Sequence, residues 1–158
     1  MFRLLRLISG LFFVILLASC TTTGLQSTDG DMVVDSPNKF AAWQLKSSRE
    51  YEAINVLLSE VDSLIENNSL DAAEDKLERI LRIKSGYAPA WSRLSWLALE
   101  ANSPKRAVQM AKRSNSFSHG NNQLQSLNWS FIRDASHALH DEEAYRRANE
   151  KIDSLQKI

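Results

Sequence analysis

Hydrophobic residues recur at helical spacing along residues 47–158. Apolar side chains three and four residues apart share one helix face. The first such set is Ile54, Leu57, Leu58, Val61, Leu64 and Ile65. Ser47 and Glu50 stand before it with the spacing of a capping box. The run Asn67-Asn68-Ser69 then ends this predicted helix.

The alternation of helix, break and helix continues to the end of the chain. Ser69 is a candidate N-cap for a second helix, which Lys84 and Gly86 close. Breaks follow at Asn102-Ser103-Pro104 and at Asp141. The later helices carry these apolar positions: Leu70, Ala73, Leu77, Ile80 and Leu81; Trp91, Leu94 and Ala98; Ala107, Val108 and Ala111; Leu124, Leu127, Phe131, Ile132, Ala135 and Leu139; Ala144, Ala148, Ile152 and Leu155. No run alternates with period two, so the fold class is all-α.

The predicted helix pairs share a repeat register. Ala73 and Ala107 are 34 residues apart, which is the tetratricopeptide period. The second pair carries the residue types of that repeat at Trp91, Leu94, Ala98, Ala107 and Ala111, and the first pair carries them at Leu57, Leu64, Ala73 and Leu77. Val61 stands where the pattern has a small residue.

The third pair is displaced, because Ala107 and Ala144 are 37 residues apart. We place the three extra residues around Ser114 to Asn122. The chain thus resembles tetratricopeptide (TPR) proteins, which implies about three helical hairpins in a short superhelix, with the third as a cap. Ala73, Ala107 and Ala144 are then expected where paired helices cross closely. An unrelated helical bundle is the alternative.

The N-terminal residues have the layout of a secretory signal, with Arg3 and Arg6 before an apolar run from Leu11 to Leu17. That run falls short of the roughly 20 apolar residues of a transmembrane helix. Leu17-Ala18-Ser19-Cys20 resembles the lipobox of bacterial lipoproteins. The resemblance implies a signal peptide at 1–19, lipid attachment at Cys20, a flexible periplasmic tether over 20–46 and the helical domain at 47–158. The alternative is that Cys20 is an ordinary residue near a standard cleavage site.

The same sorting signals favour inner-membrane retention when an aspartate follows the cysteine. Thr21 stands there, so we expect the outer membrane, facing the periplasm. Removal of residues 1–19 leaves 17 basic residues against 19 acidic ones. This balance suggests no nucleic-acid partner. Cys20 is the only cysteine, so no internal disulfide is expected.

No catalytic constellation is present, and we expect neither an enzyme nor a small-molecule substrate or cofactor. His137 and His140 lie beside Asp134 and Asp141, a spacing that suits a metal ion, but a third clear ligand is lacking, so no metal is expected. The third histidine is His119. Asp62 and Glu66, four residues apart, are interpreted as part of a solvated face.

The tetratricopeptide resemblance implies a concave groove lined by the first helix of each hairpin. Its groove positions fall on Trp96, Trp129 and Arg133, with Arg93 next to the same face. Trp and Arg are enriched in interface hot spots, so these four residues are the candidate partner-binding set. The alternative is that both Trp side chains pack against neighbouring helices.

A narrower resemblance rests on Arg113-Ser114-Asn115, Leu124-Gln125, Asn128-Trp129, Ile132, Asp141 and Ala144. Together with the anchor and tether, this set is similar to tetratricopeptide outer-membrane lipoproteins that activate a class A penicillin-binding protein. The resemblance implies a protein-binding module that activates a bifunctional peptidoglycan synthase. A pilotin-like assembly factor for an outer-membrane secretin or pilus complex is the alternative.

Overall fold

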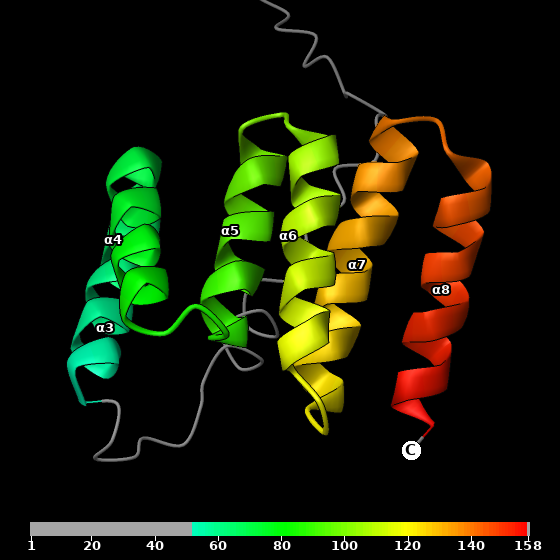
Figure 1. The fold of residues 1–158 in the computed structure, drawn as a ribbon. Helices are drawn as coiled ribbons and strands as arrows, with labels where there is room; N and C mark the ends of the chain where they lie inside the picture. Colours follow the sequence, from blue (N-terminus) through cyan, green and yellow to red (C-terminus); the bar gives the residue numbers. More distant parts are fainter. Residues whose placement is uncertain (1–51, 158) are drawn as a thin grey trace, which may run out of the picture. The chain divides into compact units, whose positions relative to one another are not determined.

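The computed structural model describes residues 52–157, and these form six α-helices with no β-strand among them (Figure 1). The prediction of an all-helical domain is therefore confirmed for this part of the chain. The helices are α3 (Glu52–Glu66), α4 (Leu70–Ile83), α5 (Ala88–Glu100), α6 (Pro104–Phe117), α7 (Asn122–Ala138) and α8 (Glu142–Gln156). Consecutive helices pair as three hairpins, α3 with α4, α5 with α6 and α7 with α8.

Several predicted features lie outside the described residues. They are the signal peptide at 1–19, the lipid site Cys20, the tether at 20–46 and the capping box of Ser47 and Glu50. Within residues 52–157, no helix is both long and apolar enough to cross a membrane.

The turn within each hairpin has the same backbone geometry. Asn68, Asn102 and His140 adopt positive φ angles of 55°, 50° and 56° just after the first helix of their hairpins. The next residue then donates its N–H to a carbonyl five residues earlier: Ser69 to Leu64 at 2.8 Å, Ser103 to Ala98 at 2.8 Å and Asp141 to Ser136 at 2.9 Å. This is the hydrogen bond of a Schellman helix end, and it needs a left-handed residue before the donor. The turns of the three hairpins thus share one local structure.

The connections between hairpins are also equivalent. Tyr87 donates its backbone N–H to Lys84 O at 3.1 Å, and Asn121 donates to Ser118 O at 3.0 Å. These two loops are 34 residues apart, as are the first two turns. The loop at 118–121 is therefore no longer than the loop at 84–87, and the prediction of extra residues around 114–122 is wrong.

The additional length lies in helix α7, which has 17 residues where α5 has 13. Four residues are about one helical turn, so the insertion preserves which face of α7 meets its neighbours. It also moves the register of the last helix. Tyr145, four residues after the N-cap Asp141, is the equivalent of Ala73 and Ala107, each of which donates to its own N-cap carbonyl. Ala144 is only partly buried, whereas Ala148 is fully buried, so Ala144 is not the fully buried small residue that the repeat spacing predicts in α8.

The first two small positions do lie where helices cross. Ala73 and Ala107 are fully buried, and Ser95 Oγ of α5 donates a hydrogen bond to Ala107 O of α6 at 2.8 Å. A side chain as short as serine reaches the opposite backbone only when the two helices approach closely. The expected crossing of small residues is therefore confirmed in the central hairpin.

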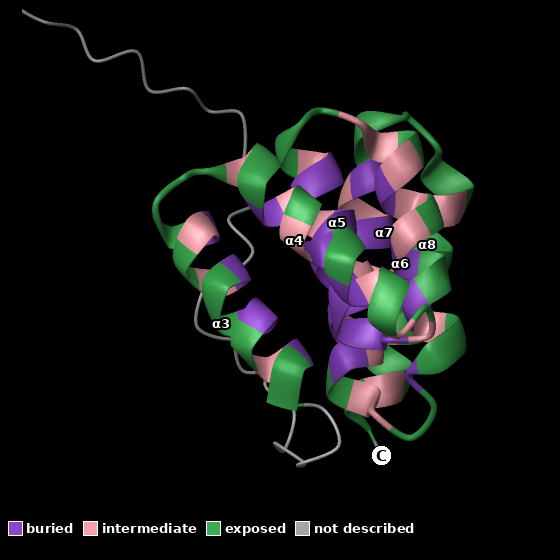
Figure 2. Cartoon of the chain, turned by 60° about the vertical axis from the view of Figure 1, so that its left-hand side comes forward, coloured by how far each residue is buried: buried purple, intermediate pink, exposed green. Residues whose placement is uncertain are grey.

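The extent to which a helix is buried depends on how many neighbouring helices it has. Helix α5 is buried on most of its surface, because α4, α6 and α7 all pack against it. Helix α8 buries fully only Ala148, and its charged residues are exposed. Exposed parts of the chain are green in Figure 2. Such a polar outer face is what a terminal repeat requires for solubility.

Candidate protein-binding surface

Two half-buried indoles lie on the first helices of the second and third hairpins. Trp96 is on α5 and Trp129 is on α7, and both pack against the hydrophobic core. Each of these residues is partly exposed and partly packed against the core. The sequence offered a groove position and a core position as alternatives, and both descriptions apply in part to Trp96 and Trp129. Helices α5 and α7 pack against each other, so the two indoles border one continuous core.

Arg133 lies one helical turn beyond Trp129 and so shares its face of α7. Its Nε donates to Asp134 Oδ1 at 2.8 Å, and the Arg133 and Asp134 side chains are 26% and 11% exposed. Burial raises the pKa of Asp134, and the hydrogen bond from Arg133 opposes that rise. Arg133 is thus held by a neighbouring carboxylate while part of its guanidinium still faces solvent.

Arg93 is not part of this surface. Only 2% of the residue is exposed, and its Nε and Nη2 donate to the two carboxylate oxygens of Asp62 at 3.0 and 3.1 Å. Burial lowers the pKa of Arg93, and the charge of Asp62 opposes that effect. The assignment of Arg93 as a partner contact is therefore corrected: its guanidinium joins α5 to α3.

The same contact corrects the interpretation of Asp62 as part of a solvated face. Asp62 faces the neighbouring hairpin, while Glu66 is exposed. A second ion pair, between Arg106 of α6 and Glu74 of α4, joins the same two hairpins through their second helices. Both ion pairs could have been predicted from the sequence, because the partners are 31 and 32 residues apart. In a 34-residue repeat, residues at nearly that spacing lie on equivalent helices of adjacent hairpins.

Three residues of the narrower family resemblance, Ser114, Asn115 and Asn128, belong to a polar cluster between helices. Asn128 of α7 is fully buried and its Nδ2 donates to Ser114 Oγ and Asn115 Oδ1 of α6, both at 2.8 Å. Ser114 Oγ in turn donates to Ala88 O of α5 at 2.8 Å. This polar cluster connects three helices from two hairpins, although the buried Asn115 Nδ2 and Asn128 Oδ1 find no hydrogen-bond partner among the described residues.

The histidines and acidic residues of the described segment do not assemble a metal site, because no three His, Cys, Asp or Glu side chains gather there. The ring of His137 stacks at a tilt on Tyr145 with centroids 6.0 Å apart, and His140 occupies the left-handed turn position.

The chain was compared with protein-family models, with curated proteins and with solved structures, and none of them matches it. The candidate surface is therefore defined by the residues of this chain alone. Trp96, Trp129 and Arg133 provide aromatic area and a partly exposed guanidinium on the first helices of adjacent hairpins. This combination is suited to binding a protein partner.

Proposed function

We propose that this protein is a tetratricopeptide-type binding module that uses the first helices of its hairpins, α5 and α7 above all, to hold a protein partner. The observation that carries the proposal is the pair of half-buried indoles, Trp96 and Trp129, which border one core. Rigid aromatic side chains that are already packed on one side lose little conformational entropy when a partner covers the other. The shared turn geometry of the three hairpins supports the repeat assignment.

For the partner we propose a bifunctional peptidoglycan synthase of the class A penicillin-binding type. This part rests on the sequence resemblance and on the lipobox that ends at Cys20. A lipid anchor in the outer membrane, followed by the tether at 20–46, would place the module in the periplasm. Activation then requires that the module bind the active conformation of the synthase more tightly than the inactive one, because a ligand shifts an equilibrium only by its difference in affinity.

A site-specific photocrosslink tests the surface and the partner together. A photoreactive phenylalanine at Arg133 lies beside Trp129, and the same residue at Arg146, exposed on α8, is the matched control. We expect a crosslink to a class A penicillin-binding protein from position 133 and not from 146. A crosslink to an outer-membrane secretin subunit would favour the pilotin-like function, and equal crosslinking from both positions would reject the proposed surface.

Binding by substituted proteins gives a second, quantitative test. Arg133→Ala removes no apolar core side chain, but it leaves the largely buried Asp134 without its hydrogen bond, so its melting temperature is measured as well. It should weaken binding to the purified synthase by about 2 kcal/mol, or about thirtyfold, if Arg133 is a hot spot. Trp129→Ala should weaken binding at least as much, and its melting temperature separates a binding defect from a folding defect. Unimpaired activation of the synthase by folded Arg133→Ala and Trp129→Ala proteins would contradict the proposal.

A further inference from the structure

A second surface lies on the other helices of the hairpins, at the C-terminal ends of α4 and α6. We call it the basic–apolar face, and its residues are Arg79, Arg82 and Ile83 of α4 and Lys112, Arg113 and Phe117 of α6. Ile83 and Phe117 are 34 residues apart, as are Arg79 and Arg113. Because the first two hairpins repeat with that period, these residues occupy equivalent places on adjacent hairpins.

The cations of this face have no carboxylate partner in the described part of the chain. Ion pairs engage Lys76, Arg93, Arg106, Arg133, Arg146 and Arg147. Arg79, Arg82, Lys112 and Arg113 are exposed and take part in none of these. Helix α6 contains no acidic residue. On α4, Asp75 and Glu78 lie one turn before Arg79 and Arg82 but form no ion pair with them, and the charge of Glu78 also acts on Arg106. The face therefore presents a local excess of positive charge on a chain whose formal net charge is zero.

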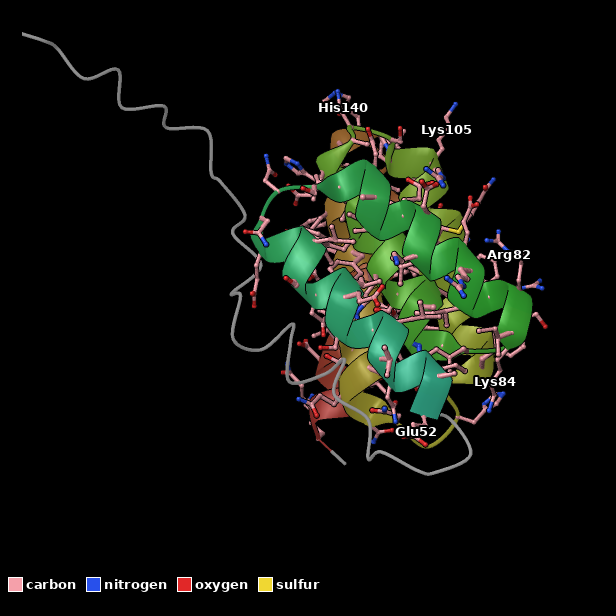
Figure 3. All side chains as sticks on the ribbon, turned by 90° about the vertical axis from the view of Figure 1, so that its left-hand side faces the viewer. Glu52, Arg82, Lys84, Lys105 and His140 are labelled. Atoms are coloured by element: carbon pink, nitrogen blue, oxygen red, sulfur yellow. The ribbon has the colours of Figure 1, made fainter. Side chains whose placement is uncertain are left out.

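Apolar side chains lie among these cations. Ile83 is 55% exposed and Phe117 is 41% exposed. The Arg113 guanidinium lies 5.3 Å from the Phe117 ring centroid and 5.5 Å from that of Trp91. The Trp91 indole is itself fixed by a 2.7 Å hydrogen bond to Ser85 O. Arg113 and the two aromatic rings are thus held in place before any ligand arrives. Figure 3 shows Arg82 projecting outward on the side of α4.

We propose that the basic–apolar face binds the anionic phospholipid surface of a membrane. The four cations would meet lipid phosphates, and Ile83 and Phe117 would reach the boundary of the acyl chains. Cations next to exposed aromatic and aliphatic side chains are the chemistry of membrane-surface helices. An acidic protein would have to supply pockets that match Ile83 and Phe117, whereas a fluid bilayer accepts them wherever they lie. Nucleic acid is disfavoured, because the chain as a whole is not basic.

This inference is independent of the partner-binding surface, since it concerns α4 and α6 and not α5 and α7. Its consequence is orientation. With α4 and α6 on the bilayer, the domain would have one defined orientation relative to the membrane. A protein partner would then bind to the helices that face away from the bilayer.

A fluorescence experiment on the full chain tests the proposal. Ser116→Cys places a label on α6 between Arg113 and Phe117, and Ser154→Cys places one on α8. Both serines are exposed and both donate to the carbonyl three residues earlier, Arg113 O and Lys151 O, so they are a matched pair. The unsubstituted chain treated with the same dye gives the background from any Cys20 thiol that is not acylated. Acrylamide quenching is measured on phosphatidylethanolamine vesicles with and without one third phosphatidylglycerol.

We expect the quenching constant of the label at 116 to fall at least twofold on the anionic vesicles only, to recover in 0.5 M NaCl because the contact is electrostatic, and to stay unchanged at 154. Each cation near an anionic surface contributes about fivefold in affinity. The variant Arg79→Gln/Arg82→Gln/Lys112→Gln, which keeps the Arg113 stack, should therefore lose about a hundredfold and with it the protection. The control Arg146→Gln/Arg147→Gln/Lys151→Gln removes the same charge from α8 and should keep the protection.

Three results would overturn the proposal. The first is equal quenching at position 116 on neutral and anionic vesicles. The second is equal protection of the labels at 116 and 154. The third is protection by soluble polyglutamate as strong as by vesicles, which would mean that the face binds an acidic polypeptide. None of these outcomes bears on binding at Trp129 and Arg133, so the two proposals fail separately.

Discussion

Removing the carboxylate of Asp62 should destabilise the protein far more than removing its partner. Arg93 is 2% exposed and depends on Asp62 for two hydrogen bonds from Nε and Nη2. Arg93 Nη1 also donates to Pro89 O, at the longer distance of 3.4 Å. Asp62→Asn therefore removes the carboxylate that accepts two hydrogen bonds from a buried guanidinium. Arg93→Met leaves a carboxylate that water can reach.

The structure sets the size of this asymmetry. Breaking a fully buried pair by removing one partner costs about 3–5 kcal/mol. The Asp62 side chain is 34% exposed, so water relieves part of the penalty, and we expect Asp62→Asn to lower the free energy of unfolding by about 2–3 kcal/mol. Arg93→Met replaces the buried cation with an apolar side chain and should cost about 1 kcal/mol or less. The double substitution should resemble Arg93→Met alone.

Urea denaturation followed by circular dichroism measures these differences, provided that the slope of the transition is unchanged. Glu66→Gln is the matched control, because Glu66 is exposed on the same helix, and it should change stability by no more than about 0.5 kcal/mol. If Asp62→Asn is as harmless as Glu66→Gln, or if Arg93→Met is the more damaging of the two, the contact is not the buried ion pair described above.

Four further predictions concern the turns, the crossings, the titration and the anchor. Ala107→Leu should cost about 1–3 kcal/mol by overpacking, and an unchanged thermal midpoint would contradict the close crossing. Asn102→Ala should cost about 1 kcal/mol because of its positive φ, whereas Asn102→Gly should not; equal losses would argue against the left-handed turn. Burial raises the pKa of Asp134 above its usual 3.8. The ionised carboxylate therefore lowers the free energy of unfolding at pH values above the raised pKa. This loss of stability disappears as the pH falls toward 3.8, where the carboxyl is protonated. Asp134→Asn should accordingly stabilise the protein at pH 7 and lose that advantage near pH 4 in parallel denaturation experiments; a pH-independent difference would refute this. Cys20→Ala should leave the protein unprocessed or unanchored, and acyl labelling that persists in this variant would exclude Cys20 as the lipid site.

Local physics made the helices predictable from the sequence. The run Asn67-Asn68-Ser69 marked a helix end because Asn tolerates the left-handed conformation that a Schellman turn requires. Asp141 marked a helix start, and its side chain does accept the N–H of Ala144 at 2.9 Å. The burial of Ala73 and Ala107 followed from their 34-residue spacing, since a repeated period implies a repeated packing environment.

Only the tertiary structure decided where the third hairpin departs from that period. The 37-residue spacing of Ala107 and Ala144 predicts extra residues around Ser114 to Asn122. The hydrogen bonds of the loops and turns instead place one extra helical turn inside α7. The error arose because a turn of four residues restores the same helix face, so the apolar pattern along α7 gives no sign of the insertion.

The roles of individual polar residues also needed the folded chain. Arg93 and Arg133 both stand near predicted groove positions, yet the first is buried against a carboxylate 31 residues away and the second is paired with its own neighbour. Periodicity assigns a residue to a helix face, because that is a property of its own helix. Whether the face meets solvent, a counter-charge or a core is determined by the neighbouring hairpin, and that packing exists only in the assembled domain.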